Sequence, residues 1–213
     1  MKMVKNLFLW SLPVIVPLLA ITSYEFYIFY TPPGILSERN ADGSYETIEP
    51  FELISQEKES FNSDKLEGEY YLANFFFISC PDICPRMNNQ MEEFYHKFAR
   101  SDNFRLVSFT VNPEYDTPEK LQEYATNLNV SYPDWVFLTG DKREIYRLAR
   151  NSFRVSAAEG DGGPDGFIHS ELLILVDDQG RLRGFYESSD NTEMRRLKKD
   201  LELLLDNDKK LAS

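Results

Sequence analysis

Basic residues are scarce in this chain, and cysteine and histidine are scarcer still, with two of each. The 213 residues include 23 lysines and arginines against 35 aspartates and glutamates, which gives a formal net charge of −12. A chain this acidic repels phosphate backbones, so we do not expect it to bind nucleic acid. Internal repeats are also absent from the sequence. The remaining composition, 42% apolar, is that of a globular protein long enough for one packed domain with additional segments.

The N-terminus differs from the rest of the chain. Lys2 and Lys5 precede a run, residues 7–23, that contains no charged residue. With the aromatic stretch Y-E-F-Y-I-F-Y that follows, this segment reaches the length needed to span a bilayer. Residues 1–30 are therefore predicted to form a membrane anchor, with the soluble domain on the exported side, periplasmic or equivalent. A cleaved signal peptide is the alternative, for which L-A-I-T-S offers only a poor cleavage site.

The order of the predicted elements indicates the fold. Residues 31–50 contain T-P-P-G and N-A-D-G-S and are interpreted as a linker, which leaves residues 51–213 for the domain. Sequence patterns predict strands at residues 51–54, 70–78, 104–111, 135–138, 171–176 and 181–186. They predict helices at residues 88–100, 117–129, 141–151 and 191–205. This alternation, closed by a hairpin and a helix, predicts an α/β fold of the thioredoxin-like kind: a mixed sheet with helices on both faces.

The two cysteines, Cys80 and Cys84, lie together in F-F-F-I-S-C-P-D-I-C-P-R-M, where a predicted strand meets a helix. Open α/β sheets place their chemistry at the carboxyl ends of strands. Proline is tolerated only in the first turn of a helix, so Pro85 predicts a helix start just before it, with Asp82 as the N-cap. Helix N-termini favour thiolates. We therefore expect both sulfurs to be partly accessible and to ionise readily.

Three uses of this cysteine pair remain open on the residues alone. A structural disulfide across three intervening residues closes a very small loop and would stabilise the fold little. The same short spacing suits a redox pair that switches between thiols and disulfide. Two thiolates also form part of a soft metal site, which favours Cu(I) but needs a third ligand. A peroxidase is disfavoured because Arg86 is the only candidate near the pair for binding peroxide.

Two histidines are available as the third ligand. His96 lies about three turns further along the cysteine helix, so we expect a solvated surface residue that points away from the pair. His169 ends a loop that contains four glycines and begins a strand. That loop could fold over the cysteine end of the sheet. A histidine at a strand start is more often structural, so spacing alone makes His169 a candidate and no more.

Several segments resemble the Sco/SenC family, membrane-anchored proteins that serve copper delivery to cytochrome c oxidase. The cysteine stretch resembles the family signature, and V-S-F-T-V-N-P-E-Y-D-T-P-E-K-L-Q-E-Y-A, residues 107–125, resembles its second motif. F-I-H-S, followed by L-V-D-D-Q-G-R-L, resembles the histidine segment of the family. The segments occur in the family's order, and the resemblance covers residues 51–206.

The resemblance implies a thioredoxin-like domain that holds one copper ion, Cu(I) or Cu(II), through Cys80, Cys84 and His169. It implies a metallochaperone, not an enzyme, that delivers copper to the binuclear site of the copper-bearing oxidase subunit. The alternative is a thiol:disulfide oxidoreductase, with Cys80 and Cys84 as its catalytic redox pair, that keeps the oxidase cysteines reduced. Two positions depart from the family: Asn112 stands where an aspartate is usual, and residues 167–168 lack the acid often found beside the histidine.

Overall fold

The computed structural model describes residues 47–80, 83–98, 101, 103–155 and 170–211. The predicted anchor, residues 1–30, and nearly all of the predicted linker lie outside these ranges. Among the helices that the structure describes, none combines the length and the apolar character needed to cross a bilayer.

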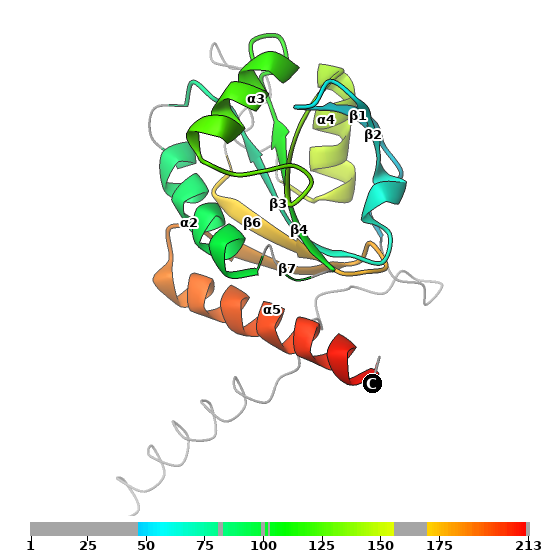
Figure 1. Cartoon of the computed structure of the whole chain (residues 1–213), viewed down its shortest axis with the longest axis vertical. Helices are drawn as coiled ribbons and strands as arrows, with labels where there is room; N and C mark the ends of the chain where they lie inside the picture. The colour runs from blue at the N-terminus through cyan, green and yellow to red at the C-terminus, as the bar shows by residue number, and fades with distance from the viewer. Residues whose placement is uncertain (1–46, 81–82, 99–100, 102, 156–169, 212–213) are drawn as a thin grey trace, which may run out of the picture. The chain divides into compact units, whose positions relative to one another are not determined.

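Seven strands form one mixed sheet in the order β2-β1-β5-β4-β3-β6-β7 (Figure 1). The strands are β1 (Glu52–Ser55), β2 (Ser60–Asn62), β3 (Tyr70–Phe76), β4 (Phe104–Thr110), β5 (Trp135–Thr139), β6 (Leu172–Val176) and β7 (Leu182–Glu187). Strands β3, β4 and β5 are parallel to one another, whereas β1 and β6 pair antiparallel with the two outer strands of this group. The sheet is therefore mixed, as the sequence predicts.

Strand β3 is the element that places the cysteines. All of its residues are buried, and each of them from Tyr70 to Phe76 is in register with a residue of β4. Neighbouring side chains on a strand point to opposite faces. Phe75 accordingly stacks on Phe109 on one face, with ring centroids 5.1 Å apart, while Phe76 stacks on Tyr124 on the other, at 5.6 Å. Burial of each phenylalanine side chain stabilises the folded state by about 1.5–3 kcal/mol, so these contacts fix the position of β3.

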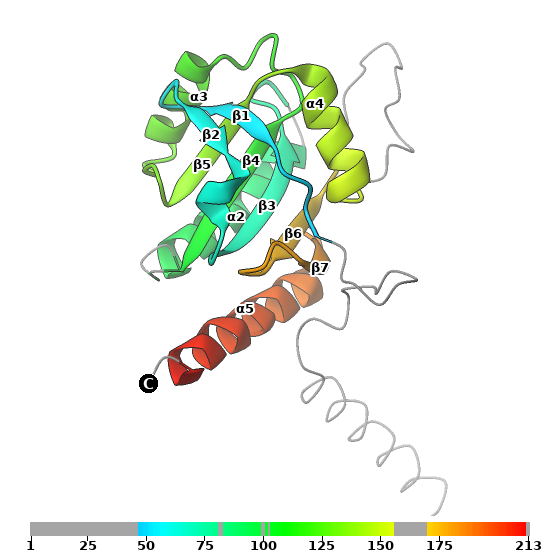
Figure 2. The ribbon, with the colours of Figure 1, turned by 90° about the vertical axis from the view of Figure 1, so that its right-hand side faces the viewer.

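Helices cover both faces of the sheet (Figure 2). They are α2 (Ile83–Phe98), α3 (Pro118–Asn127), α4 (Lys142–Arg147) and α5 (Asn191–Leu211). Helix α2 contacts the sheet through Tyr95 and Trp135, and α5 contacts it through Asp200, which accepts a hydrogen bond of 2.7 Å from the Tyr186 hydroxyl. On the opposite face, Phe153 follows α4 and packs its ring against Phe75.

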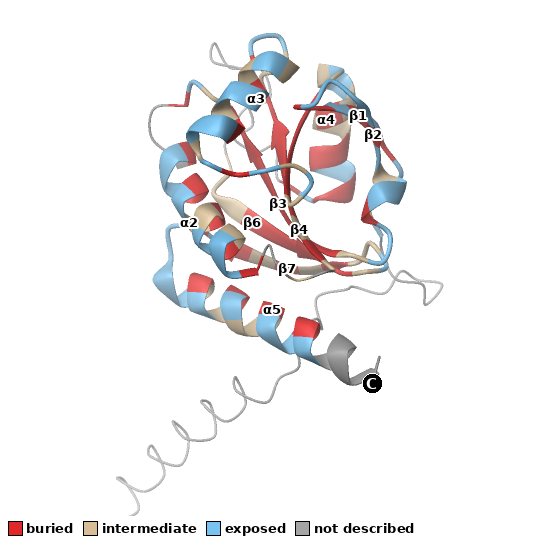
Figure 3. Cartoon of the chain, viewed as in Figure 1, coloured by how far each residue is buried: buried red, intermediate tan, exposed pale blue. Residues whose placement is uncertain are grey.

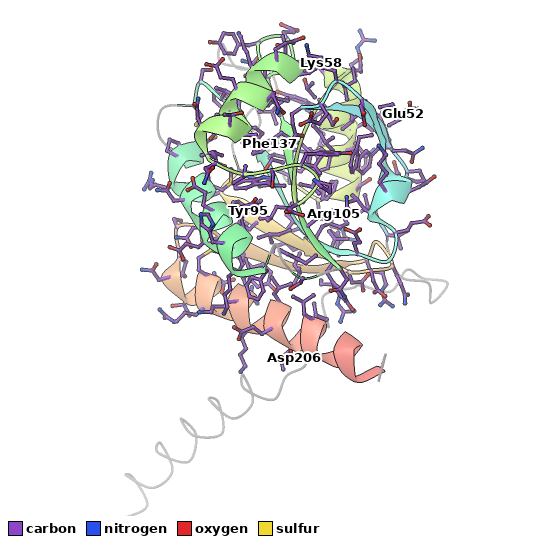
Figure 4. All side chains as sticks on the ribbon, viewed as in Figure 1. Glu52, Lys58, Tyr95, Arg105, Phe137 and Asp206 are labelled. Atoms are coloured by element: carbon purple, nitrogen blue, oxygen red, sulfur yellow. The ribbon has the colours of Figure 1, made fainter. Side chains whose placement is uncertain are left out.

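The interior between these layers is apolar and largely aromatic. Figure 3 shows buried residues concentrated on the strands and on the inward sides of the helices, and Figure 4 shows Phe137 inside the layer that α2 and α3 cover. Phe137 lies edge-on to Tyr124 and stacked on Trp135, with centroid distances of 5.7 and 5.1 Å. Phe137 also contacts Phe76, the last residue of β3 before the segment that leads to the cysteines.

The predicted elements are present; besides shifts at the ends of some of them, such as β3 ending at Phe76 instead of residue 78, they differ in three ways. Strand β2 and the 3-10 turn η1 (Ser63–Leu66) were not predicted, because S-F-N is too short for a periodic signal. The third predicted helix, residues 141–151, is divided into α4 and a π-helical turn, η2 (Leu148–Ser152). The predicted helix at residues 88–100 begins earlier, at Ile83, in agreement with the start that Pro85 indicates.

Candidate metal and redox site

The cysteine pair lies at the junction between β3 and α2. Strand β3 ends at Phe76, Cys80 follows in the connecting segment, and Cys84 is the second residue of α2. Pro85 is the third, which is the position that a proline can occupy without losing a helical hydrogen bond. Asp82 lies outside the described residues, so its role as N-cap stays a prediction.

The first turn of α2 brings the two cysteines together. The backbone N–H of Cys84 donates to the Cys80 Sγ at 3.4 Å, so the sulfur of one cysteine lies against an N–H group of the first helical turn. The backbone N–H of Cys80 donates to the Phe77 carbonyl at 3.3 Å and closes a turn before the helix. The two cysteines are not joined by a disulfide in this structure. Two soft donors at one helix start can serve a metal ion or exchange a disulfide.

The expected accessibility of both thiols and the expected acidity of Cys84 are wrong for this structure. Cys80 and Cys84 are buried, with 8% and 6% of their surface exposed. The pKa of Cys84 is raised to about 12, mainly by burial; the hydrogen bond with Cys80 acts in the same direction, while a backbone hydrogen bond with Phe77 opposes the rise. The helix start does supply an N–H group to the sulfur of Cys80, but at Cys84 the loss of solvation outweighs the helix. Cys84 is therefore held as a neutral thiol.

The structure describes only one of the two histidines, His96. His169 lies outside the described residues, so its place as the third ligand stays a prediction. His96 is exposed on α2, which confirms its interpretation as a solvated surface residue. Within the ranges that the structure describes, no three histidine, cysteine or acidic side chains cluster closely enough to hold a metal ion. Of the three predicted copper ligands, the structure therefore describes two, Cys80 and Cys84.

Sequence reasoning missed three polar residues near Cys84: Asn88, Asp116 and Tyr124. Asn88 is 2% exposed and donates through its amide to the Tyr124 hydroxyl, and Asp116 is fully buried. Burial is the main cause that raises the pKa of Tyr124 to about 12. Cys84 and Asp116 act in the same direction. The spacing of four residues from Cys84 to Asn88 was a usable signal, since such pairs share a helix face.

The fold and this junction define a class of protein. A mixed sheet in which a central parallel strand leads through two cysteines into a helix is the thioredoxin-like arrangement, and this chain has it. The model of the SCO1/SenC family matches residues 39–205. The chain belongs to the SCO1/SenC family.

Individual relatives agree with this assignment. The SCO1 protein homolog of Bacillus subtilis is 35% identical over 151 residues, which cover 70% of this chain and 77% of that protein. The structure of BsSco, a member of the Sco family of cytochrome c oxidase assembly proteins in which a disulfide switch was identified, is 32% identical with a TM-score of 0.63 and covers 75% and 94% of the two chains. The structure of Bradyrhizobium japonicum ScoI with copper bound is 25% identical, with a TM-score of 0.58 and coverages of 74% and 97%.

The raised pKa of Cys84 predicts slow alkylation of the reduced, metal-free protein. At pH 8 a shift of the thiol pKa from 9 to about 12 lowers the thiolate fraction by about a thousandfold, and burial slows attack further. We expect iodoacetamide to modify Cys84 at least about tenfold more slowly in the native protein than in 8 M urea, with a rate that keeps rising above pH 9. Peptide mass spectrometry after timed quenching measures this rate, and equal native and unfolded rates would show that the thiol is exposed and ionised.

Proposed function

We propose that this protein is a copper metallochaperone that binds copper through Cys80, Cys84 and His169 and delivers it to the binuclear copper site of cytochrome c oxidase. The observation that carries the proposal is the placement of Cys84 in the first turn of α2 and of Cys80 just before it, with the Cys80 sulfur accepting the Cys84 N–H. Membership of the SCO1/SenC family supports it, as does the copper bound in the structure of a relative.

The chemistry of the donors suits the transfer of copper as cargo. Thiolate sulfur is a soft ligand that selects Cu(I), and an imidazole nitrogen binds Cu(I) and Cu(II) alike. A site with few ligands, borne at a helix start and on a loop, allows incoming ligands of the acceptor to replace those of the donor one at a time. The thiols must lose their protons when copper binds, because the thiolate is the ligand.

A second candidate function is supported by the same pair. Two neighbouring thiols near a helix start can form and release a disulfide, and a disulfide switch was identified in the relative BsSco. A thiol:disulfide oxidoreductase would use Cys80 and Cys84 to keep the cysteines of the oxidase copper site reduced. The two functions share the fold and the cysteines, and they differ in their need for His169.

The proposal includes attachment to a membrane. Residues 1–30 would anchor the chain, with the copper-binding domain on the exported side near the oxidase subunit that receives the metal. Fractionation of cells after an alkaline carbonate wash tests this: the protein should stay with the membranes, and its recovery among the washed-off proteins would contradict an anchor.

Copper stoichiometry tests the ligand set. The reduced domain, residues 47–213, should bind close to one equivalent of copper under anaerobic conditions, as measured by elemental analysis after desalting. Cys80→Ser and Cys84→Ser should each weaken binding by at least about a hundredfold, since a soft thiolate ligand is lost. His96→Ala is the matched control for His169→Ala, because only the latter should lower the affinity. Wild-type protein that retains no copper after reduction would refute the metallochaperone.

The His169→Ala variant also separates the two functions in cells. It should abolish copper-dependent oxidase activity while the purified variant still exchanges its thiols with a small disulfide at close to the wild-type rate. Heme spectra of isolated membranes and oxygen uptake measure oxidase assembly. Normal assembly with His169→Ala, combined with loss of assembly in Cys80→Ser, would favour the oxidoreductase over copper delivery.

A further inference from the structure

The second family motif, residues 107–125, takes no part in the proposed ligand set, yet the structure connects it to the cysteines. At its centre is Asp116, whose side chain is fully buried. One carboxylate oxygen, Oδ2, accepts the Ile78 backbone N–H at 3.1 Å and also the Thr110 hydroxyl. Ile78 belongs to the segment that leaves β3, two residues before Cys80. A side chain of the second motif therefore holds the segment that carries the first cysteine.

The turn around Asp116 is built to hold this carboxylate in place. Asn112 donates its backbone N–H to the Thr110 Oγ1 at 3.0 Å and accepts the Asp116 backbone N–H at 2.9 Å. Thr110 is the last residue of β4, where it pairs with Phe76 of β3. The connection runs from β4 through Thr110 and Asp116 to Ile78, and then through the turn between Phe77 and Cys80.

Stability alone does not explain a carboxylate at this place. Its Oδ1 atom has no hydrogen-bond partner among the residues that the structure describes, although it is buried. Burial raises the pKa of Asp116, and the hydrogen bonds from Thr110 and Ile78 oppose that rise. Leaving a buried acceptor unpaired costs about 1–3 kcal/mol, and an apolar residue of similar shape would avoid that cost. The contact with the cysteine segment gives the carboxylate a use that a buried apolar residue could not provide.

We propose that Asp116 is a positioning residue for the cysteine pair: by accepting the Ile78 N–H it fixes residues 77–80 and so holds the Cys80 sulfur over the start of α2. The inference rests on the proposed use of the cysteines. The second motif is then the support of the cysteine segment, and it performs this role with Asn112 in place of the usual aspartate, since Asn112 contributes here through its backbone.

The equilibrium between thiols and disulfide tests the proposal without copper. In this reaction Cys80 and Cys84 pass two protons and two electrons to oxidised glutathione, forming one disulfide and two molecules of reduced glutathione. The equilibrium constant depends on how closely the two sulfurs are held. Asp116→Ala should shift it toward the dithiol by about tenfold, the worth of one hydrogen bond to a charged group. Asp116→Asn should stay within about threefold of wild type, because its amide oxygen can still accept the Ile78 N–H.

A matched control lies on the same strand. Asn74 is fully buried in β3, accepts the Ser108 hydroxyl at 2.5 Å and leaves its Nδ2 unpaired among the described residues. Asn74→Ala should lower the thermal midpoint as a buried polar deletion does, yet leave the glutathione equilibrium unchanged. If Asp116→Ala does not fold, Thr110→Val decides the matter, since it frees the carboxylate and should shift the equilibrium in the same direction by about threefold.

Three results would overturn the proposal: an unchanged equilibrium in Asp116→Ala, an equally large shift in Asp116→Asn, or an equal shift in Asn74→Ala. For copper, the absorption of the thiolate–Cu(II) complex should change in Asp116→Ala and be restored in Asp116→Asn. If wild-type protein binds no copper, the proposed metallochaperone function fails, whereas the glutathione equilibrium still tests the placement of the cysteines by Asp116.

Discussion

The pairing of β3 with β4 is the constraint on which the site depends. Register is maintained along the whole of β3, and the Val111 N–H extends it by donating to the Phe76 carbonyl at 2.8 Å. Aromatic rings on both faces prevent the strand from sliding, because a shift by one residue would exchange Phe75 with Phe76 and reverse the two faces. The chain must therefore leave the sheet at one fixed point. Pro85 limits where α2 can begin. The cysteines therefore lie where a fixed strand end, Phe76, meets a fixed helix start, Ile83.

Two opposing effects act on the ionisation of these thiols. The start of α2 offers N–H groups and a positive partial charge, which favour thiolates, while burial favours the neutral form. Burial prevails at Cys84, and the buried Asp116 acts in the same direction. Cys84 therefore stays protonated near neutral pH, and any cation that bound its sulfur would have to replace that proton.

Sequence reasoning predicted much of the fold because its signals are local. The apolar runs of β3 and β4, the helix start before Pro85, and the helix that follows Thr117 with Pro118 at its first position depend on neighbouring residues alone. Burial of the cysteines was not predicted, since it depends on how helices and strands distant in the sequence pack around them. Asp116 was missed for the same reason: its contact with Ile78 joins residues 38 positions apart, and no periodic pattern carries that information. His169 could be proposed from the family resemblance but not from packing.

X-ray absorption at the copper edge is the most direct test of the account, because it reports the atoms bound to the metal. The reduced domain loaded with one equivalent of Cu(I) should show a sulfur shell fitted by two scatterers, together with imidazole scattering that disappears in His169→Ala and persists in His96→Ala. A first shell made only of nitrogen and oxygen, or a sulfur shell unchanged when both Cys80 and Cys84 are replaced by serine, would contradict a copper site at the start of α2.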